Sequence, residues 1–271
     1  MPELPEVETT RLGVAPLVNS QQIKKIVIRE DRLRWKVPSV LITQLPQQRI
    51  VDVKRRGKYL LFYTNTGCAI LHLGMSGSLR YLPVDTPVKK HDHVDIIFTN
   101  GYCMRFNDPR RFGALLWTTE DPLKHPLLAK LGPEPFSDEF NADYLYKRSR
   151  KRSVAIKNFI MNSQIVVGVG NIYANEALFD AGIRPNVAAG RISKQRYKVL
   201  VGAIQGILKK AIKSGGTTLR DFTASDGKPG YFSQHLNVYG KNHSACANCG
   251  HEIRQMTIGQ RASYYCPHCQ R

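Results

Sequence analysis

Two closely spaced pairs of cysteines near the C-terminus constrain the fold of this chain more than any other feature. The pairs are Cys246-x2-Cys249 and Cys266-x2-Cys269, and sixteen residues separate them. This is the spacing of a tetrahedral four-cysteine zinc ribbon, in which each pair lies at one end of a β-hairpin. Four thiolate ligands leave no coordination position open for water. We therefore expect one structural Zn²⁺ that takes no part in catalysis.

The segment between the two pairs carries an arginine, Arg261, near the expected tip of the hairpin. A guanidinium group presents a rigid fork of donors that matches a phosphate. Arg261 is therefore a candidate phosphate ligand, and the alternative is that it belongs to a solvated turn. The other two cysteines, Cys68 and Cys103, stand alone within apolar runs and are expected to be buried strand residues.

The chain is strongly basic. Its 271 residues include 40 basic and 21 acidic side chains, a formal net charge of +19 and a pI near 9.8. Such an excess favours a polyanionic partner, and nucleic acid fits it better than a membrane surface. No apolar run approaches the ~20 residues that a membrane span needs, and the N-terminus lacks the layout of a secretory signal. We expect a soluble protein of the cytoplasm or, in a nucleated cell, of the nucleus or an organelle.

The first half of the sequence reads mostly as β-structure after one opening helix. Strands are expected at residues 22–28, 59–63, 68–73, 93–98 and 102–106, with a turn at 65–67. Asn100-Gly101 is the preferred dipeptide of a type I′ hairpin turn. Several short strands at this spacing favour a sandwich or a barrel, and we predict a β-sandwich.

The second half reads as helical. Ser153 is expected to cap a helix that runs to about Met161, and Asn171 to cap a second helix after a glycine turn, which is a helix–turn–helix arrangement. A third helix is expected after Ser193, with a buried face made by Tyr197, Leu200, Val201, Ile204, Ile207 and Leu208.

These elements predict an α+β, multidomain chain. Its expected parts are an N-terminal β-sandwich domain with flanking helices (1–131), a hinge and linking helix (132–150), a helical domain that ends in a long loop (151–235) and a zinc finger (236–271).

The N-terminus carries a candidate nucleophile. Initiator methionine is commonly removed before proline, and Pro2 would then expose a secondary amine with a pKa near ~8. Attack of this amine on a sugar aldehyde carbon gives an iminium that has no N–H to lose and persists as an electron sink. Glu3 adjoins it and Glu6 lies one helical turn further on. The alternative is an ordinary capped helix whose acids complement the helix dipole.

Several separate stretches resemble one family, the formamidopyrimidine-DNA glycosylase/endonuclease VIII family, in the order typical of it. They are the N-terminal Met-Pro-Glu-Leu-Pro-Glu-Val-Glu-Thr, Arg56-Gly57-Lys58, His72-Leu73-Gly74-Met75-Ser76-Gly77, Asn107-Asp108-Pro109-Arg110-Arg111-Phe112-Gly113, residues 168–176 and the four-cysteine tail. Leu4 stands where the endonuclease VIII branch typically has glycine, which favours the formamidopyrimidine-DNA glycosylase branch.

The resemblance implies a base excision repair enzyme that removes oxidised purines, mainly 8-oxoguanine opposite cytosine and formamidopyrimidines. Pro2 would attack C1′ of the damaged nucleoside, and Glu3 would act as the acid/base. Elimination of the 3′ and then the 5′ phosphate would nick the strand. Glu6 would line the lesion pocket, and Lys58 and Arg261 would complete the catalytic set as phosphate ligands.

The resemblance also implies a DNA-binding set. Met75, Arg110 and Phe112 would fill the gap left by the extruded nucleotide. Phosphate contacts would come from His72, Lys157, Asn171 and Tyr239, and the loop at 217–234 would cover the flipped base. The expected partner is damaged double-stranded DNA, bound by a monomer in the bacterial cytoplasm at the nucleoid.

Two other functions stay open at this point. One is the same chemistry with a preference for oxidised pyrimidines, as in endonuclease VIII. The other is a non-enzymatic, basic zinc-ribbon protein that binds DNA or RNA by charge. A free and exposed Pro2 beside Glu3 separates an enzyme from a binding module.

Overall fold

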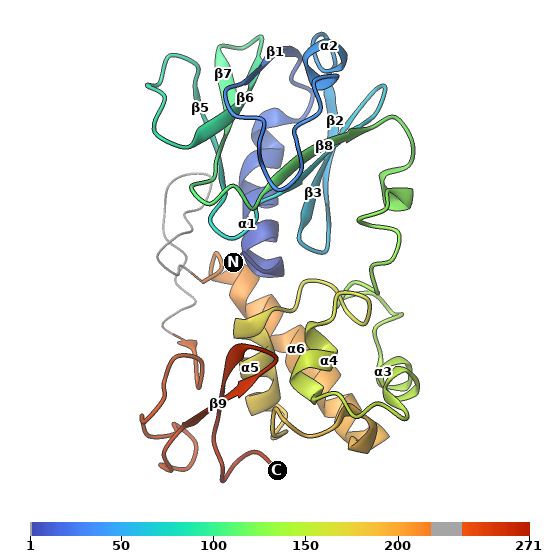
Figure 1. Ribbon diagram of the computed structural model, residues 1–271, viewed down its shortest axis with the longest axis vertical. Coiled ribbons are helices and arrows are strands. Elements are labelled where there is room, and N and C mark those ends of the chain that lie inside the picture. The colour runs from blue at the N-terminus through green and yellow to red at the C-terminus, as the bar shows by residue number, and fades with distance from the viewer. Residues whose placement is uncertain (1, 218–234) are drawn as a thin grey trace. The chain divides into compact units, whose positions relative to one another are not determined.

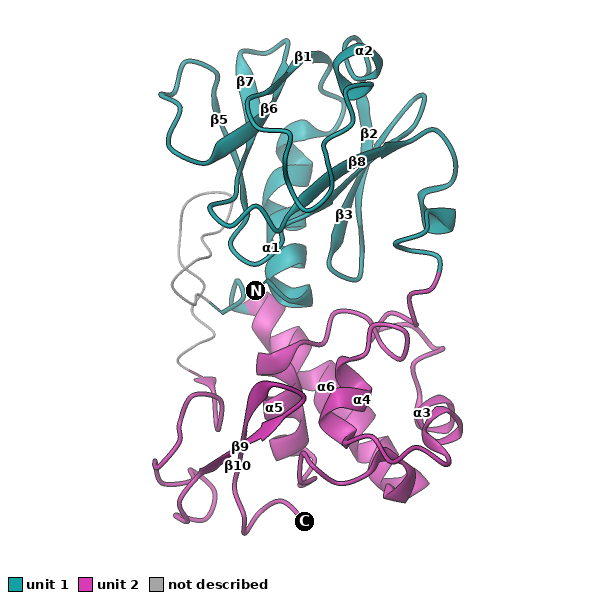
Figure 2. Cartoon of the chain, viewed as in Figure 1, with its two compact units in different colours: residues 1–129, 214–233 teal, residues 130–213, 234–271 magenta. Residues whose placement is uncertain are grey.

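The computed structural model of the chain describes residues 2–217 and 235–271. The chain divides into two compact units (Figure 2). The first comprises residues 1–129 and 214–233, and the second comprises residues 130–213 and 234–271. Residues 214–233 therefore belong to the first unit, although residues 130–213 of the second unit separate them from the rest of it in the sequence.

The first unit contains two four-stranded antiparallel sheets (Figure 1). One has the order β1 (Ile23–Ile28), β6 (Asp92–Phe98), β7 (Tyr102–Asn107), β5 (Ser78–Pro83). The other has the order β2 (Ile50–Arg56), β3 (Tyr59–Thr64), β4 (Cys68–His72), β8 (Ala114–Thr118). The unit also holds α1 (Leu4–Val18), the short α2 (Leu41–Gln44) and a 3-10 turn at Pro122–Lys124.

One hydrophobic core joins the two sheets and α1. Val14 of α1, Phe62 of β3 and Phe98 of β6 are all buried in it. Burial of each such side chain stabilises the fold by roughly 1.5–3 kcal/mol, so the two sheets are held together by this shared core. The predicted β-sandwich is confirmed, and Cys68 and Cys103 are buried strand residues as expected.

The hairpin between β6 and β7 differs from the prediction. Its loop spans residues 99–101, and only Gly101 has a positive φ, of 85°. A type I′ turn needs positive φ at both central residues, so the predicted turn type is wrong. The Asn100 side chain accepts a hydrogen bond from the Tyr102 N–H at 3.1 Å, which holds this longer loop.

The second unit is helical with one hairpin. It contains α3 (Ala142–Ser149), α4 (Ile156–Met161), α5 (Asn171–Asp180), α6 (Lys194–Lys213), a 3-10 turn at Ala189–Arg191 and the hairpin of β9 (Arg254–Ile258) and β10 (Arg261–Tyr265). The predicted face of α6 is buried throughout, from Tyr197 to Leu208. Sheet unit, helical unit and hairpin together confirm the predicted α+β class.

Two helices begin at other residues than predicted. Helix α4 begins at Ile156 with Ala155 at its N-cap, because Ala155 forms a β-bridge with Ala188 and the Val154 carbonyl accepts the Ala189 N–H. Ser153 therefore lies outside the helix. In α5 the N-cap is Gly170, and Asn171 is the first helical residue. Within the residues that the structure describes, no helix is long and apolar enough to cross a membrane.

Candidate functional site

The N-terminal turn of α1 gathers the first candidate site residues in the first unit. Glu3 is the N-cap, and the Glu6 carboxylate accepts the Glu3 N–H through Oε2 at 2.8 Å. The other oxygen, Oε1, accepts the Thr217 N–H at 2.8 Å. Glu3 and Glu6 are each only 3 % exposed. One buried carboxylate thus joins the start of the chain to a segment more than two hundred residues later.

The segment that reaches Glu6 needs glycine to do so. Gly216 has φ +81°, and a Cβ placed there would lie 3.0 Å from Glu6 Oε1. Any larger residue at this position would meet both backbone strain and the carboxylate. The remainder of the predicted capping loop, residues 218–234, lies outside the described residues.

Pro2 is buried in the structure. The expectation of an exposed amine applies to the chain from which Met1 has been removed, and it stays a prediction. Leu4, Pro5 and Val7, the next apolar residues along the chain, are buried as well. In this form the Met1–Pro2 peptide bond makes the nitrogen an amide, which is not nucleophilic.

A second group lies at the neighbouring ends of β3 and β4. The two strands pair Tyr59 with His72, and their ring centroids are 4.8 Å apart. Lys58 immediately precedes Tyr59 in the turn after β2. Burial, reinforced by the positive charges of Lys58 and Arg34, lowers the pKa of His72 to about 4. His72 is therefore neutral near pH 7.

The hydrogen bonding of His72 fixes which nitrogen carries its proton. Nδ1 accepts the N–H of Gly74 at 3.0 Å, so Nε2 bears the hydrogen of the neutral ring. His72 thus offers a hydrogen-bond donor that carries no charge, and the neighbouring Lys58 offers a donor together with a positive charge. Such a pair suits a phosphate oxygen.

Arg34 is a member of this group that the sequence reasoning missed. Its N–H donates to the Gly113 carbonyl at 3.0 Å, and its guanidinium lies 4.6 Å from the centre of the Trp35 ring. The mixture of basic and aromatic residues in Arg32-Leu33-Arg34-Trp35 was the signal available in the sequence.

Two turns of the first unit are fastened together by one buried carboxylate. Asp108, which is fully buried, accepts the Ser76 hydroxyl at 2.8 Å and the Gly113 N–H at 2.7 Å. A Cβ placed on Gly74 would lie 2.4 Å from the Gly113 nitrogen, so the turns touch through their backbones. The turn after β4 (residues 73–77) and the turn before β8 (residues 108–113) therefore form one unit, which we call the rim.

This rim brings together the three predicted wedge residues. Arg110 and Phe112 are exposed, with the guanidinium 4.9 Å from the ring centre, and Met75 is half-buried. Phe112 is 45 % exposed, so its ring is available to another molecule. Beside the rim lies an open pocket of about 750 Å³, which is lined by Arg32, Leu33, Arg34, His72, Gly74, Met75, Arg110, Arg111 and Phe112.

In the second unit, Lys157 lies in an unexpected environment. It is fully buried on α4, and its ammonium donates to the Ala262 carbonyl at 2.8 Å and to the Ser263 hydroxyl at 2.6 Å. The side chain therefore holds the β9–β10 hairpin, whereas the other predicted DNA contacts on this unit retain exposed surface.

Asn171 and Asn175 of α5 hold the same hairpin. Asn171 Nδ2 donates to the Ala262 carbonyl at 3.3 Å, and Asn175 Oδ1 accepts the Tyr264 N–H at 2.7 Å. Arg261, just beyond the turn, is exposed. The turn residues Gly259 and Gln260 both have positive φ, 55° and 62°, as a type I′ turn requires.

Glu176 fixes the position of the backbone at Tyr239. Its carboxylate is fully buried and accepts the N–H groups of Asn237, Val238 and Tyr239 at 2.8, 3.0 and 2.8 Å. Burial raises the pKa of Glu176, although the three N–H groups oppose that rise. The Tyr239 ring packs edge-on against Tyr264, with centroids 5.3 Å apart. Sequence reasoning assigned no role to Asn175 or Glu176.

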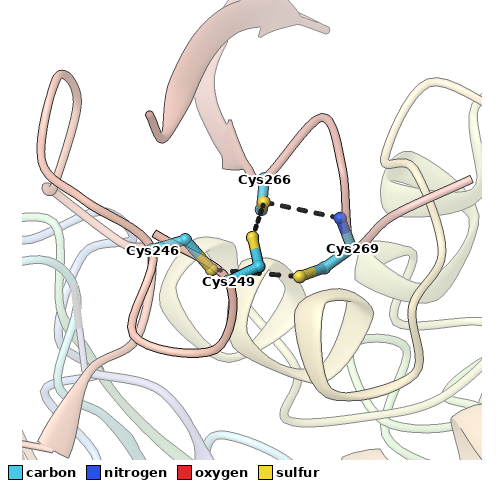
Figure 3. A group of neighbouring side chains, drawn as sticks. All are labelled: Cys246, Cys249, Cys266 and Cys269. Atoms are coloured by element: carbon cyan, nitrogen blue, oxygen red, sulfur yellow. Dashed lines mark hydrogen bonds between the residues drawn. The ribbon is translucent and has the colours of Figure 1, made fainter. Parts of the chain in front are cut away.

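The four cysteines of the tail converge (Figure 3). Cys246 Sγ lies 3.9 Å from Cys269 Sγ, and Cys249 Sγ lies 3.5 Å from Cys266 Sγ. Tetrahedral zinc with Zn–S bonds of about 2.3 Å requires sulfur separations of about 3.8 Å. The Cys269 N–H also donates to Cys266 Sγ at 3.4 Å. The donor set therefore fits one structural zinc ion, which locks the base of the hairpin.

Comparisons with known proteins agree with this arrangement over the whole chain. The family model of the formamidopyrimidine-DNA glycosylase N-terminal domain matches residues 1–115, and that of the H2TH domain of the same enzymes matches residues 131–223. A model described as a zinc finger found in FPG and IleRS matches residues 244–271.

Relatives and solved structures are similar over their full length. Formamidopyrimidine-DNA glycosylases of Stenotrophomonas maltophilia (strain K279a) and Syntrophotalea carbinolica are each 57 % identical, with 100 % of both chains covered.

A complex of Lactococcus lactis Fpg with DNA containing an abasic site superposes with a TM-score of 0.92 at 34 % identity, over 99 % of both chains. The MutM (FPG) protein of Thermus thermophilus gives 0.89 at 34 % identity, over 99 % of this chain and 98 % of that one. The chain is accordingly a DNA-binding repair enzyme, a DNA glycosylase that belongs to the formamidopyrimidine-DNA glycosylase family.

Proposed function

We propose that this enzyme is a bifunctional DNA glycosylase/AP lyase that excises oxidised purines, namely 8-oxoguanine opposite cytosine and formamidopyrimidines. The arrangement that carries the proposal is the N-terminal turn of α1, where Pro2, Glu3 and Glu6 follow one another at a buried helix start. A relative of known structure was solved with DNA that contains Fapy-dG, which supports the same class of lesion. A purely non-enzymatic zinc-ribbon protein is ruled out by membership of a glycosylase family.

The chemistry begins with removal of Met1, which turns the Pro2 nitrogen into a secondary amine. The amine attacks C1′ of the lesion nucleoside, and the bond from C1′ to the base breaks with its electron pair leaving on the base. The nitrogen then loses its proton, and its lone pair opens the sugar ring while Glu3 protonates the ring oxygen O4′. The product is an iminium between Pro2 and C1′.

The iminium then drives strand cleavage. Its positive charge acidifies the C2′ proton, whose loss expels the 3′ phosphate. A second elimination expels the 5′ phosphate. Glu3 is the nearest carboxylate along the chain to carry these protons. A buried site suits this sequence, since water would hydrolyse the intermediate early.

Phosphate binding is proposed for residues of both units. In the first unit, Lys58 supplies a charge and His72 a neutral Nε2–H donor. In the second unit, Arg261 and Asn171 lie at adjoining ends of the hairpin and α5, and Tyr239 packs beside them against Tyr264. Lys157 acts on DNA through the hairpin that it holds, because its ammonium is buried against Ala262.

The exposed rim is proposed to fill the gap that base extrusion leaves. Phe112 is a large apolar side chain that is 45 % exposed, and apolar wedges of this kind kink DNA between base steps. Arg110, stacked on that ring, can hydrogen-bond the unpaired cytosine. Glu6 is proposed to line the lesion pocket, where it also fastens Thr217 at the start of the segment 217–234. The structural zinc holds the hairpin through Cys246, Cys249, Cys266 and Cys269.

Excision of matched duplexes tests the proposal. Protein lacking Met1 is expected to release 8-oxoguanine opposite cytosine faster than thymine glycol and to leave phosphates on both sides of the gap. Faster release of thymine glycol would assign the enzyme to oxidised pyrimidines. Pro2→Gly preserves a free amine but loses the ring, and it is expected to lose the covalent adduct that borohydride traps in the wild type. Glu3→Gln is expected to bind lesion DNA and turn over poorly. Its near-normal excision would remove Glu3 from the mechanism.

The setting proposed for this reaction is a monomer acting on the chromosome in the bacterial cytoplasm. The bacterial origin of the relatives named above supports it.

A further inference from the structure

Two histidines of the zinc finger have no role in the reaction described so far. His251 follows the first cysteine pair by two residues, and His268 lies within the second pair. Both side chains are exposed, and their rings stack with centroids 4.4 Å apart and planes 6° from parallel. Among residues 2–217 and 235–271, the ring nitrogens of these two histidines make no hydrogen bond.

A thiolate lies next to this pair. One ring nitrogen of His251, one of His268 and Cys249 Sγ all lie within 4.8 Å of one another. Cys249 is only half-buried, whereas Cys246 and Cys266 are buried. The three ligand atoms thus form a second group at the solvent face of the zinc centre.

The charge of the zinc centre favours a cation at this face. Four thiolates and one Zn²⁺ leave the centre with two negative charges, and a thiolate sulfur retains lone pairs after binding one metal ion. It can therefore bridge to a second. Imidazole and thiolate are ligands that Zn²⁺, Co²⁺, Ni²⁺ and Cu²⁺ prefer, whereas Mg²⁺ and Ca²⁺ select oxygen.

We propose that His251, His268 and Cys249 bind a second divalent transition-metal ion, which shares the Cys249 thiolate with the structural zinc. The fourth position of this ion is open to solvent. Parallel stacked rings do not aim their nitrogens at one point, so each imidazole turns about its side-chain bonds when the ion binds. Both rings are exposed, and their nitrogens make no hydrogen bond within the part of the chain that the structure describes, so this rotation costs little free energy.

Cobalt is the probe that separates this site from the four-cysteine site. Protein containing one zinc per chain is titrated with Co²⁺, and the absorption bands of cobalt bound to thiolate are recorded, since zinc itself is silent. Native mass spectrometry counts the zinc and the cobalt in the same samples. Co²⁺ binds such ligands more weakly than Zn²⁺, so it does not readily displace the structural ion.

The expected result for the wild-type chain is one zinc plus one cobalt, with a cobalt–thiolate band. His251→Gln and His268→Gln are each expected to weaken cobalt binding at least about tenfold, and the double variant to abolish the band while keeping its zinc. His243→Gln is the matched control, because His243 is an exposed histidine of the same finger that bonds Glu252 and lies outside the group. It is expected to bind cobalt like the wild type.

Four results would overturn the proposal. They are no uptake of cobalt, uptake only with loss of an equal amount of zinc, a full band in the double variant, or loss of the band in His243→Gln. If the double variant loses its structural zinc, the two single variants decide: unchanged cobalt affinity in both rejects the site.

Discussion

Replacement of Glu6 by glutamine tests whether this carboxylate joins the N-terminal turn of α1 to Thr217. The substitution keeps the size of the side chain and removes one acceptor. In the native chain both oxygens accept backbone N–H groups at 2.8 Å, one from Glu3 and one from Thr217. A glutamine side chain can satisfy only one of them and turns an NH₂ group toward the other.

The structure sets the expected magnitude. One hydrogen bond to a charged group, worth about 1.5–3 kcal/mol, is lost, and a buried N–H without an acceptor costs about 1–3 kcal/mol. These two effects overlap, so we expect Glu6→Gln to lower the free energy of unfolding by about 2–4 kcal/mol in total. For a domain of this size that loss lowers the Tm by roughly 5–15 °C.

Thermal unfolding of the zinc-loaded chain measures this effect, and single-turnover excision of 8-oxoguanine measures its consequence for catalysis. Glu120→Gln is the matched control in the same unit, because Glu120 is exposed. Surface substitutions of this kind usually change the free energy of unfolding by no more than about 0.5 kcal/mol. If Glu6→Gln were no less stable than Glu120→Gln, the bridging role assigned to Glu6 would be refuted.

The remaining predictions concern charge and burial. Lys58→Ala is expected to weaken binding to all DNA sequences and to reduce the salt dependence by roughly one unit of slope; an unchanged slope would mean that Lys58 touches no phosphate. His72 has a pKa of about 4 in the folded chain and near 6.5 when unfolded, so the unfolded chain takes up a proton in that window and stability falls as the pH is lowered through it. Between pH 7 and pH 4, the free energy of unfolding measured by chemical denaturation should therefore fall less in His72→Gln than in the wild type. An equal fall in both would contradict the lowered pKa of His72. Lys157→Met is expected to destabilise the chain by more than about 2 kcal/mol, since the Ala262 carbonyl and the Ser263 hydroxyl lose a charged donor. It is also expected to weaken DNA binding, as is Arg261→Ala. Unaltered stability with weakened binding would instead place Lys157 directly on DNA.

The sequence predicted the features that depend on local pattern. Alternating and apolar runs located β1, β3, β4, β6 and β7 to within about two residues of their observed bounds, whereas β2, β5 and β8 were not predicted. The apolar face of α6 is buried as its 3.6-residue period requires. The spacing of the four cysteines identified the zinc ligands, because a hairpin of fixed length brings the two pairs together.

The features that depend on partners distant in sequence were not predictable. Helix α4 starts late because Ala155 forms a β-bridge with Ala188 and Val154 accepts the Ala189 N–H, which the capping signal of Ser153 could not reveal. The burial of Lys157 depends on a hairpin that begins about a hundred residues later. Glu176 looks like a surface acid in the sequence, and it is buried because the three N–H groups of 237–239 satisfy it.

The attachment point of the covalent intermediate tests the central claim most directly. Protein lacking Met1 is incubated with a duplex containing 8-oxoguanine opposite cytosine, the adduct is trapped with borohydride, and its tryptic peptides are sequenced by mass spectrometry. The account predicts a single sugar adduct on the nitrogen of Pro2, and none in chains that retain Met1. An adduct on a lysine such as Lys58, or an adduct formed equally well by chains that retain Met1, would contradict it.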